Sequence, residues 1–158
     1  MRDRVAYQRR LPHFQKAAKR YLITFVTRRR WILNDAARDI ALATIVAQHR
    51  QLFFLFTAIV MPDHVHAVLE PAMDEKGQTI ALAFILQRIK GASSRGINLA
   101  LNRRGKVWQD ESHDHEIRGD ESLRQKCEYI AENPVRAGLV NTPDEYRWLW
   151  RYWIDDEE

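Results

Sequence analysis

Two histidines, His64 and His66, are separated by a single residue in the segment MPDHVHAVLE. This segment contains a Pro-Asp turn and is then expected to form a β-strand, in which side chains alternate between the two faces of a sheet. His64, His66 and Val68 should therefore share one face. Imidazole is the commonest protein ligand for metal ions, so the pair provides half of a metal site. A pair of histidines in a strand can also be purely structural.

A tyrosine and an asparagine stand four residues apart further along the chain. Tyr129 and Asn133 lie in a segment expected to form a helix that Asp120 caps and that runs to about Asn133. Pro134 should stop this helix, because the residue before a proline is pushed out of the helical region. Residues four apart stack one turn from each other, which places an amide beside a phenol. An ordinary phenol on a helix surface fits the same pattern. The expected packing face of the helix is Leu123, Cys127 and Ile130.

A second pair of histidines with the same spacing, His113 and His115, lies in the polar stretch ESHDHE. By spacing alone this pair competes for a metal ion. It lacks the alternating apolar residues that surround the first pair, so we interpret it as structural or adjacent to DNA.

The remaining elements must position these side chains. Strands are expected at 21–27, 53–60 and 64–69, with short strands or edge segments at 106–109 and 115–118. Helices are expected from Asn34 or Asp35 to about residue 50 and from about residue 79. The two middle strands should form an antiparallel hairpin, because their connection is too short for a crossover. The order β-α-β-β-α-β predicts an α+β fold with a ferredoxin-like antiparallel sheet backed by helices, and a C-terminal helix that carries Tyr129.

The second of these helices has an apolar stripe and a basic side. The stripe consists of Leu82, Ile85, Ile89, Ala92 and Gly96, and it should face the sheet. Arg88, Lys90 and Arg95 fall off the stripe, where they could reach a phosphate backbone, although a solvated helix face explains them equally well.

Length and charge limit the classes of protein that fit. The 158 residues suit one domain, 20–158, preceded by a basic N-terminal arm, 1–19. No apolar run is long enough to cross a membrane, no signal peptide is evident, and a single cysteine suits a reducing cytoplasm. Residues 1–30 hold ten basic side chains and one acidic side chain. The basic ones include Lys16, Lys19, Arg28, Arg29 and Arg30. Such asymmetry favours a polyanionic partner, although a solubilising arm is an equal alternative.

Three motifs together resemble one family. MPDHVHAVLE, VWQDESHDHEIRGDESL and YIAENPVRAGLV are similar to segments of the REP-associated tyrosine transposases, relatives of the single-tyrosine HUH transposases of insertion sequences. The resemblance covers residues 21–140. Insertion-sequence relatives usually carry glutamine at the position of Asn133, and Asn followed by Pro is typical of the REP-associated branch.

The resemblance implies a set of roles for these residues. His64 and His66 would bind a divalent metal ion, Mg²⁺ or Mn²⁺, with Asn133 completing the site, and Tyr129 would be the nucleophile. The chain would be a metal-dependent single-stranded DNA endonuclease and strand transferase that cleaves hairpin-forming DNA through a 5′-phosphotyrosine intermediate. It would act in the bacterial cytoplasm in association with the nucleoid, as a monomer or a homodimer, without a membrane partner.

Three other functions fit the sequence less well. A nucleotide hydrolase needs a third histidine two residues after His66, where Val68 stands, and a zinc hydrolase needs further ligands that do not follow. A catalytically silent DNA- or RNA-binding domain of the same fold is the alternative that remains. The trio His64, His66 and Tyr129 favours the enzyme, because a binding domain has no need of it.

Overall fold

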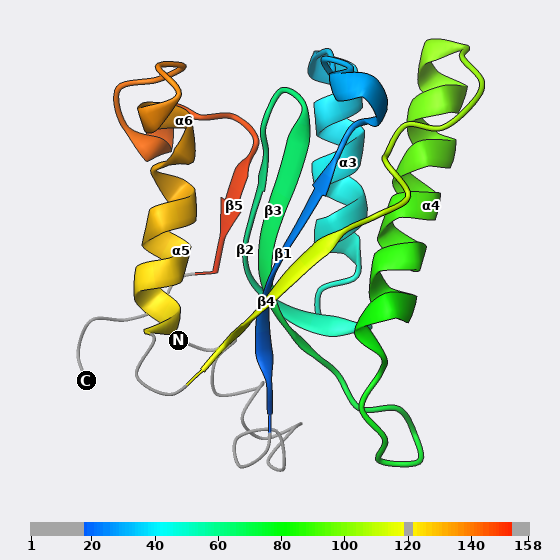
Figure 1. The fold of residues 1–158 in the computed structure, drawn as a ribbon, viewed down its shortest axis with the longest axis vertical. Helices are drawn as coiled ribbons and strands as arrows, with labels where there is room; N and C mark the ends of the chain where they lie inside the picture. Colours follow the sequence, from blue (N-terminus) through cyan, green and yellow to red (C-terminus); the bar gives the residue numbers. More distant parts are fainter. Residues whose placement is uncertain (1–17, 119–121, 153–158) are drawn as a thin grey trace.

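Five antiparallel strands form one sheet in the computed structural model, which describes residues 18–118 and 122–152 (Figure 1). The strands are β1 (Arg20–Val26), β2 (Phe53–Val60), β3 (His64–Pro71), β4 (His113–Ile117) and β5 (Leu149–Arg151). The helices are α3 (Asp35–Ala47), α4 (Leu82–Leu101), α5 (Leu123–Ala131) and α6 (Asn133–Arg136), with 3₁₀ turns η1 (Arg28–Arg30) and η2 (Pro143–Glu145). Among the described residues, no helix combines the length and hydropathy needed to span a bilayer.

The strand order β4-β1-β3-β2-β5 confirms the ferredoxin-like arrangement expected for the first four strands. β2 and β3 form the expected hairpin, and β3 lies between β2 and β1. The fifth strand, β5, pairs with the free edge of β2 and was not predicted, because three residues are too few to show a periodic pattern.

Helices cover the two faces of the sheet unequally (Figure 1). α3 and α4 lie on one face, and α5 lies on the other. The first face buries Ile23, Phe25, Val65, Ala67 and Leu69 against residues such as Ile45, Ile85 and Ile89. The second buries Phe54, Met61 and Val68 against Cys127 and Ile130 of α5. Every residue of β2 is buried, which explains why its sequence is apolar without alternation.

The buried stripe of α4 differs from the predicted one. Its buried residues are Ile85, Ile89, Ser93 and Ile97, so the stripe continues one position beyond the predicted Ala92 and Gly96. Gly96 instead faces α3, where an added Cβ would lie 2.9 Å from Cγ2 of Ile40. The glycine therefore permits the close approach of the two helices. The helix also begins at Leu82 rather than near residue 79.

Three local predictions near the C-terminal half need correction. Residues 106–109 form only an isolated bridge, between Trp108 and Thr27, and the edge strand is 113–117 rather than 115–118. Ser122 caps α5 by accepting a hydrogen bond from the Gln125 amide, whereas the predicted cap, Asp120, lies outside the described residues.

Pro134 does not simply end the helix. α5 ends at Ala131, and Asn133 and Pro134 begin the short helix α6. Proline fits the first turn of a helix, because the amide it lacks would have no partner there. Asn133 is consequently the first residue of α6 instead of the last turn of α5.

Tyr146 attaches the C-terminal segment to the sheet. Its buried hydroxyl donates a 2.6 Å hydrogen bond to the carbonyl oxygen of Val60, at the end of β2.

Tyr146→Phe should lower the free energy of unfolding by about 1 to 2 kcal/mol, because a buried carbonyl loses its partner. Urea denaturation would measure the difference. Tyr129→Phe is the matched control, because Tyr129 is 62% exposed; an equal loss in both variants would contradict the assignment.

Candidate active site

His64 and His66 project from the face of β3 on which α5 packs. Val68, two residues further, belongs to the cluster formed with α5, whereas Val65 and Ala67 belong to the core on the opposite face. The predicted alternation is therefore confirmed. The two imidazole rings lie side by side, with centroids 4.9 Å apart and planes at 78°.

Each imidazole is held through its Nδ1 atom. Nδ1 of His64 lies 2.8 Å from Oδ1 of Asp63, and Nδ1 of His66 lies 2.7 Å from the hydroxyl of Thr24, its partner on β1. An ionised carboxylate only accepts, so Nδ1 of His64 carries the proton and the lone pair lies on Nε2. The Thr24 hydroxyl can accept from Nδ1 of His66, which leaves the lone pair on Nε2, or donate to it. Within the described ranges, neither Nε2 atom has a hydrogen-bond partner.

His66 is kept neutral by its surroundings. Burial, followed by the positive charges of His64 and Arg136, lowers the pKa of His66 from 6.5 to about 4. A metal ion requires the neutral imidazole, so His66 is ready to bind without losing a proton at neutral pH.

The donors at this site fit a divalent metal ion that keeps open positions. The described part of the chain contains no group of three or more His, Cys, Asp or Glu side chains that could hold a metal ion. Two imidazoles with hydrogen-bonded Nδ1 atoms match the usual arrangement of metal-binding histidines. A third protein donor must then be of another kind, and an amide oxygen such as that of Asn133 is suitable for Mg²⁺ or Mn²⁺.

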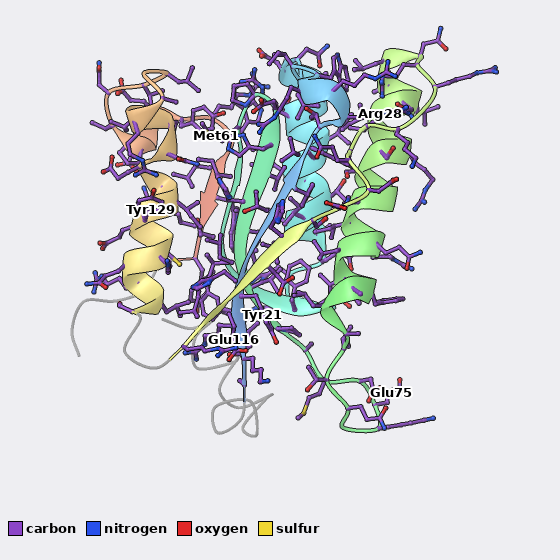
Figure 2. All side chains as sticks on the ribbon, viewed as in Figure 1. Tyr21, Arg28, Met61, Glu75, Glu116 and Tyr129 are labelled. Atoms are coloured by element: carbon purple, nitrogen blue, oxygen red, sulfur yellow. The ribbon has the colours of Figure 1, made fainter. Side chains whose placement is uncertain are left out.

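Tyr129 lies on the exposed side of α5 (Figure 2). Cys127 and Ile130 attach the helix to the sheet, and the tyrosine is rotated by about 200° from Cys127. The ring of Tyr129 is covered by the guanidinium of Arg136, 3.9 Å from its centroid. The same guanidinium donates a 2.9 Å hydrogen bond to Oδ1 of Asn133.

The two halves of the predicted site are close but not in contact. In the part of the chain that the structure describes, no hydrogen bond joins Tyr129 or Asn133 to either imidazole. Arg136 interacts with residues of both halves. Its guanidinium contacts Tyr129 and Asn133, and its positive charge lowers the pKa of His66.

The second histidine pair lies on the edge strand β4. His113 pairs with Thr24, and His115 pairs with Leu22, so both share the sheet face of His66 with β1 between them. Because the described residues contain no group of three or more His, Cys, Asp or Glu side chains that could hold a metal ion, the two pairs do not combine into one such site. Both histidines are exposed.

The predicted basic residues fall into separate groups. Arg28, Arg29 and Arg30 form η1 directly after β1, whose Val26 pairs with His64. Arg30 donates to Oδ2 of Asp63, the residue that also holds His64, so this basic cluster borders the histidines. Arg88 and Arg95 lie on α4, which covers the opposite face. Lys19 lies 4.0 Å from Glu116, and Lys16 lies outside the described residues.

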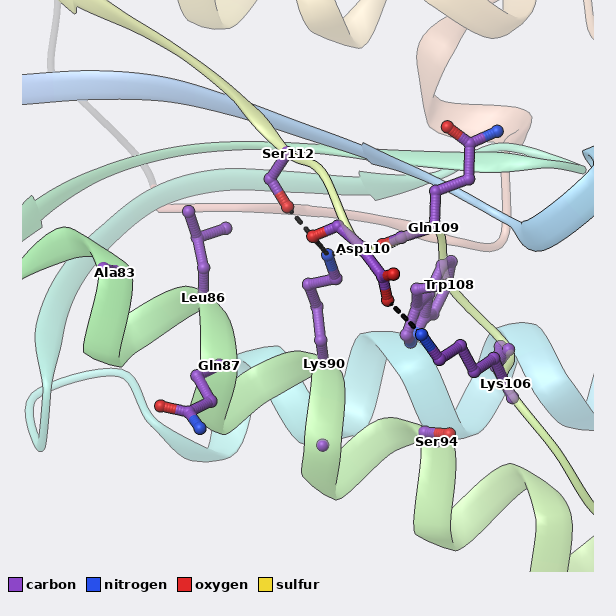
Figure 3. Close-up of a pocket in the computed structure, with 12 residues that line it drawn as sticks. Ala83, Leu86, Gln87, Lys90, Ser94, Lys106, Trp108, Gln109, Asp110 and Ser112 are labelled. Carbon is purple, nitrogen blue, oxygen red and sulfur yellow. Dashed lines mark hydrogen bonds and ion pairs between the residues drawn. The ribbon is translucent and has the colours of Figure 1, made fainter.

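Lys90 has an internal role (Figure 3). It lines a cavity of about 510 Å³ between α4 and residues 106–112. Its ammonium group donates to the carbonyl oxygens of Gln109 and Asp110, at 2.7 and 3.1 Å, and to the Ser112 hydroxyl at 2.9 Å. All three ammonium protons are thus used to fasten the segment that leads into β4.

Three residues that shape the site were not predicted from the sequence. Asp63 is adjacent to His64, and that proximity alone could have indicated its role. Thr24 is recognisable only from the register that pairs it with His66. Arg136 stands three residues after Asn133, a spacing that becomes informative once α6 is known to begin there.

Comparisons with known proteins show the family and the fold of the chain. Residues 15–133 match the family model described as "Transposase IS200 like". A Haemophilus influenzae protein assigned to the REP-associated tyrosine transposases is 25% identical over 92 residues, which cover 55% of this chain and 52% of that protein. The chain therefore spans about half the length of this curated relative.

Two solved structures share the fold. One is a REP-associated tyrosine transposase bound to a REP hairpin, with a TM-score of 0.64 and 20% identity over 83% of this chain and 75% of that one. The other, from Deinococcus radiodurans R1, is described as a transposase. It has a TM-score of 0.52 and 22% identity, and the match covers 73% of this chain and 90% of that one.

Acidification should destabilise the metal-free protein through His66. The unfolded chain protonates this residue near 6.5, whereas the folded protein does so only near 4, so the free energy of unfolding falls as the pH drops from 6.5 to 4. Urea denaturation of wild type and His66→Gln at pH 7 and pH 4.5 would measure this, with His113→Gln as control. The His66→Gln variant should lose less stability than the other two proteins. An equal loss in all three would contradict the prediction.

Proposed function

Because the chain belongs to the family of IS200-like transposases, we propose that it is a metal-dependent single-stranded DNA endonuclease and strand transferase. It would cleave hairpin-forming DNA through a 5′-phosphotyrosine intermediate. The observation that carries this proposal is the pair of adjacent imidazoles, each hydrogen-bonded at Nδ1, with no partner at Nε2 among the described residues. A purely structural pair would not need both rings fixed in this orientation.

The metal would be held by Nε2 of His64, Nε2 of His66 and the amide oxygen of Asn133. When bound, a divalent ion polarises the scissile phosphate and offsets negative charge on the leaving oxygen. Asp63 and Thr24 fix the ring orientations, and such outer partners matter for both metal affinity and activity. For Asn133 to serve as a ligand, its Oδ1 must share or exchange its hydrogen bond with Arg136.

Tyr129 would supply the nucleophile. Its phenolic oxygen attacks the scissile phosphorus, a new P–O bond forms to the tyrosine, and the bond from phosphorus to the 3′-oxygen breaks. The phenolic proton leaves to solvent, and the 3′-oxygen takes up a proton to become a 3′-hydroxyl. The phosphotyrosine bond retains the energy of the phosphodiester, so attack by another 3′-hydroxyl rejoins strands without ATP. The exposed position of Tyr129 suits a nucleophile that must meet a large substrate.

Single-stranded or hairpin DNA is the proposed partner. The cluster Arg28, Arg29 and Arg30 is exposed, and it borders the histidines through the contact of Arg30 with Asp63. Arg29 and Arg30 have positive φ values of 55° and 56°, an unfavourable conformation for residues other than glycine. Such strain recurs at binding sites, where it fixes the direction of a side chain. The basic arm, 1–19, would add electrostatic attraction for the phosphate backbone.

A catalytically silent DNA- or RNA-binding domain is the alternative. Such a domain would keep the basic cluster and the fold, and it would bind DNA without metal dependence. The two variants below separate the enzyme from this alternative.

Tyr129→Phe should abolish covalent protein–DNA adducts while changing DNA affinity by less than about threefold, because it removes one exposed hydroxyl. Labelled hairpin DNA with a single-stranded extension would be incubated with the protein and Mn²⁺, and adducts would be resolved by denaturing electrophoresis. Tyr21→Phe, on β1, is the control phenol and should form adducts normally. Adducts that persist in Tyr129→Phe would exclude Tyr129 as the nucleophile, and their absence from wild type would favour the silent binding domain.

His64→Ala should lower the cleavage rate by about 100-fold or more, because even the loss of an outer partner of a metal ligand costs about 10- to 100-fold. The assay is cleavage of the same DNA over a Mn²⁺ titration and in EDTA. His113→Ala, which removes an imidazole from the edge of the same sheet face, should retain wild-type cleavage and metal dependence. Full cleavage by His64→Ala in EDTA would exclude the metal mechanism.

A further inference from the structure

Arg136 contacts both residues of the second half of the proposed site, Tyr129 and Asn133. One terminal nitrogen of its guanidinium donates both to the carbonyl oxygen of Tyr129 and to Oδ1 of Asn133, each at 2.9 Å. Its central carbon stands 3.9 Å from the centroid of the Tyr129 ring. The side chain is thus ordered by three contacts, all to the residues proposed as nucleophile and third metal ligand.

Most of the hydrogen-bonding capacity of Arg136 is unused. A guanidinium has five N–H donors, and the two bonds above use the donors of a single nitrogen. The other three donors make no hydrogen bond within residues 18–118 and 122–152. The residue is also exposed at the surface, so a ligand can reach these donors.

The position of Arg136 calls for an anion. Its guanidinium lies 2.9 Å from Oδ1 of Asn133, the atom proposed as the third metal ligand. A guanidinium and a divalent cation repel each other at such a site unless a negative group lies between them. In the proposed reaction, the group that must lie between the metal ligands and Tyr129 is the scissile phosphodiester. Planar guanidinium groups bind phosphate oxygens with two parallel hydrogen bonds.

We propose that Arg136 binds the non-bridging oxygens of the scissile phosphate, through the donors that Tyr129 and Asn133 leave free. From the same position its guanidinium contacts the Tyr129 ring and the Asn133 amide, so the bound phosphate would lie beside both. This inference rests on the proposed function, since it names the residue that receives the substrate at that site.

A purely structural role predicts a different outcome. If Arg136 only joined α5 to α6, its loss would disturb Tyr129 and Asn133 whatever the charge of the DNA. A phosphate-binding role instead makes the effect of the arginine depend on one negative charge in the substrate. Neutralising that charge separates the two roles.

The decisive experiment is a double-mutant cycle measured by equilibrium binding. Two proteins, Tyr129→Phe and Tyr129→Phe with R136Q, would bind two DNAs that carry either a phosphodiester or a neutral methylphosphonate at the cleavage position mapped with wild type. Neither protein cleaves in the proposed mechanism, and phenylalanine keeps the ring against which Arg136 stacks. The methylphosphonate should weaken binding by about 10- to 100-fold for the first protein, the loss expected for a hydrogen bond to a charged group. With binding measured in EDTA, so that no metal ion interacts with the same phosphate, the loss for the second protein should be less than about threefold. Equal losses in both proteins would overturn the proposal.

Metal binding supplies a readout that does not depend on DNA. Mn²⁺ binding to the single variant R136Q, followed by electron paramagnetic resonance of free Mn²⁺, should be as tight as in wild type or tighter, because a neighbouring positive charge has been removed. Weaker binding would show that Arg136 organises the metal ligands, which would favour the structural role.

Matched variants guard against general effects of charge or folding. Arg124→Gln removes a positive charge from the same region, where Arg124 pairs with Glu128, and it should behave as wild type. R136K keeps the charge without the planar donors, so its affinity for the phosphodiester DNA should lie between those of wild type and R136Q. An affinity equal to that of R136Q would count against the proposal.

If wild type forms adducts but the cycle shows no coupling, Arg136 is wrongly assigned and the proposed function stands. If wild type forms no adducts, the proposed function itself fails.

Discussion

The register of β3 between β1 and β2 is the constraint on which the rest of the site depends. Val65 and Ala67 must face the core beneath α3 and α4, so the alternation of the strand sends His64 and His66 to the opposite face. A slip of one residue would bury both imidazoles and expose the core residues. The register that buries the core residues therefore also determines which face of the sheet carries the two imidazoles.

The same register supplies the groups that orient the imidazoles. Thr24 reaches His66 because β1 lies beside β3, and Asp63 reaches His64 from the turn that begins β3. Asp63 also contacts Arg30, so the basic cluster after β1 is connected to a proposed metal ligand through one carboxylate. DNA bound to that cluster would lie beside the histidines without any movement of the sheet.

The break between α5 and α6 brings the second half of the site together. α5 packs through Cys127 and Ile130, which leaves Tyr129 exposed on its other side. Arg136, in the helix that begins at Asn133, lies against Tyr129. The short helix thus gathers a phenol, an amide and a guanidinium from eight consecutive positions.

The sequence by itself determined the local features of this protein. Alternation and apolar runs predicted β2 and β3 and the shared face of His64 and His66, because each strand's pattern reflects its own burial. Three motifs predicted the family, whereas Tyr129 and Asn133, predicted to share one helix, lie in α5 and α6. Only the tertiary structure decided that Thr24 contacts His66, that β1 separates His113 from His66, and that Arg136 lies against Tyr129 and Asn133. These relations depend on strand order and helix packing between residues far apart in the chain, which no local pattern encodes.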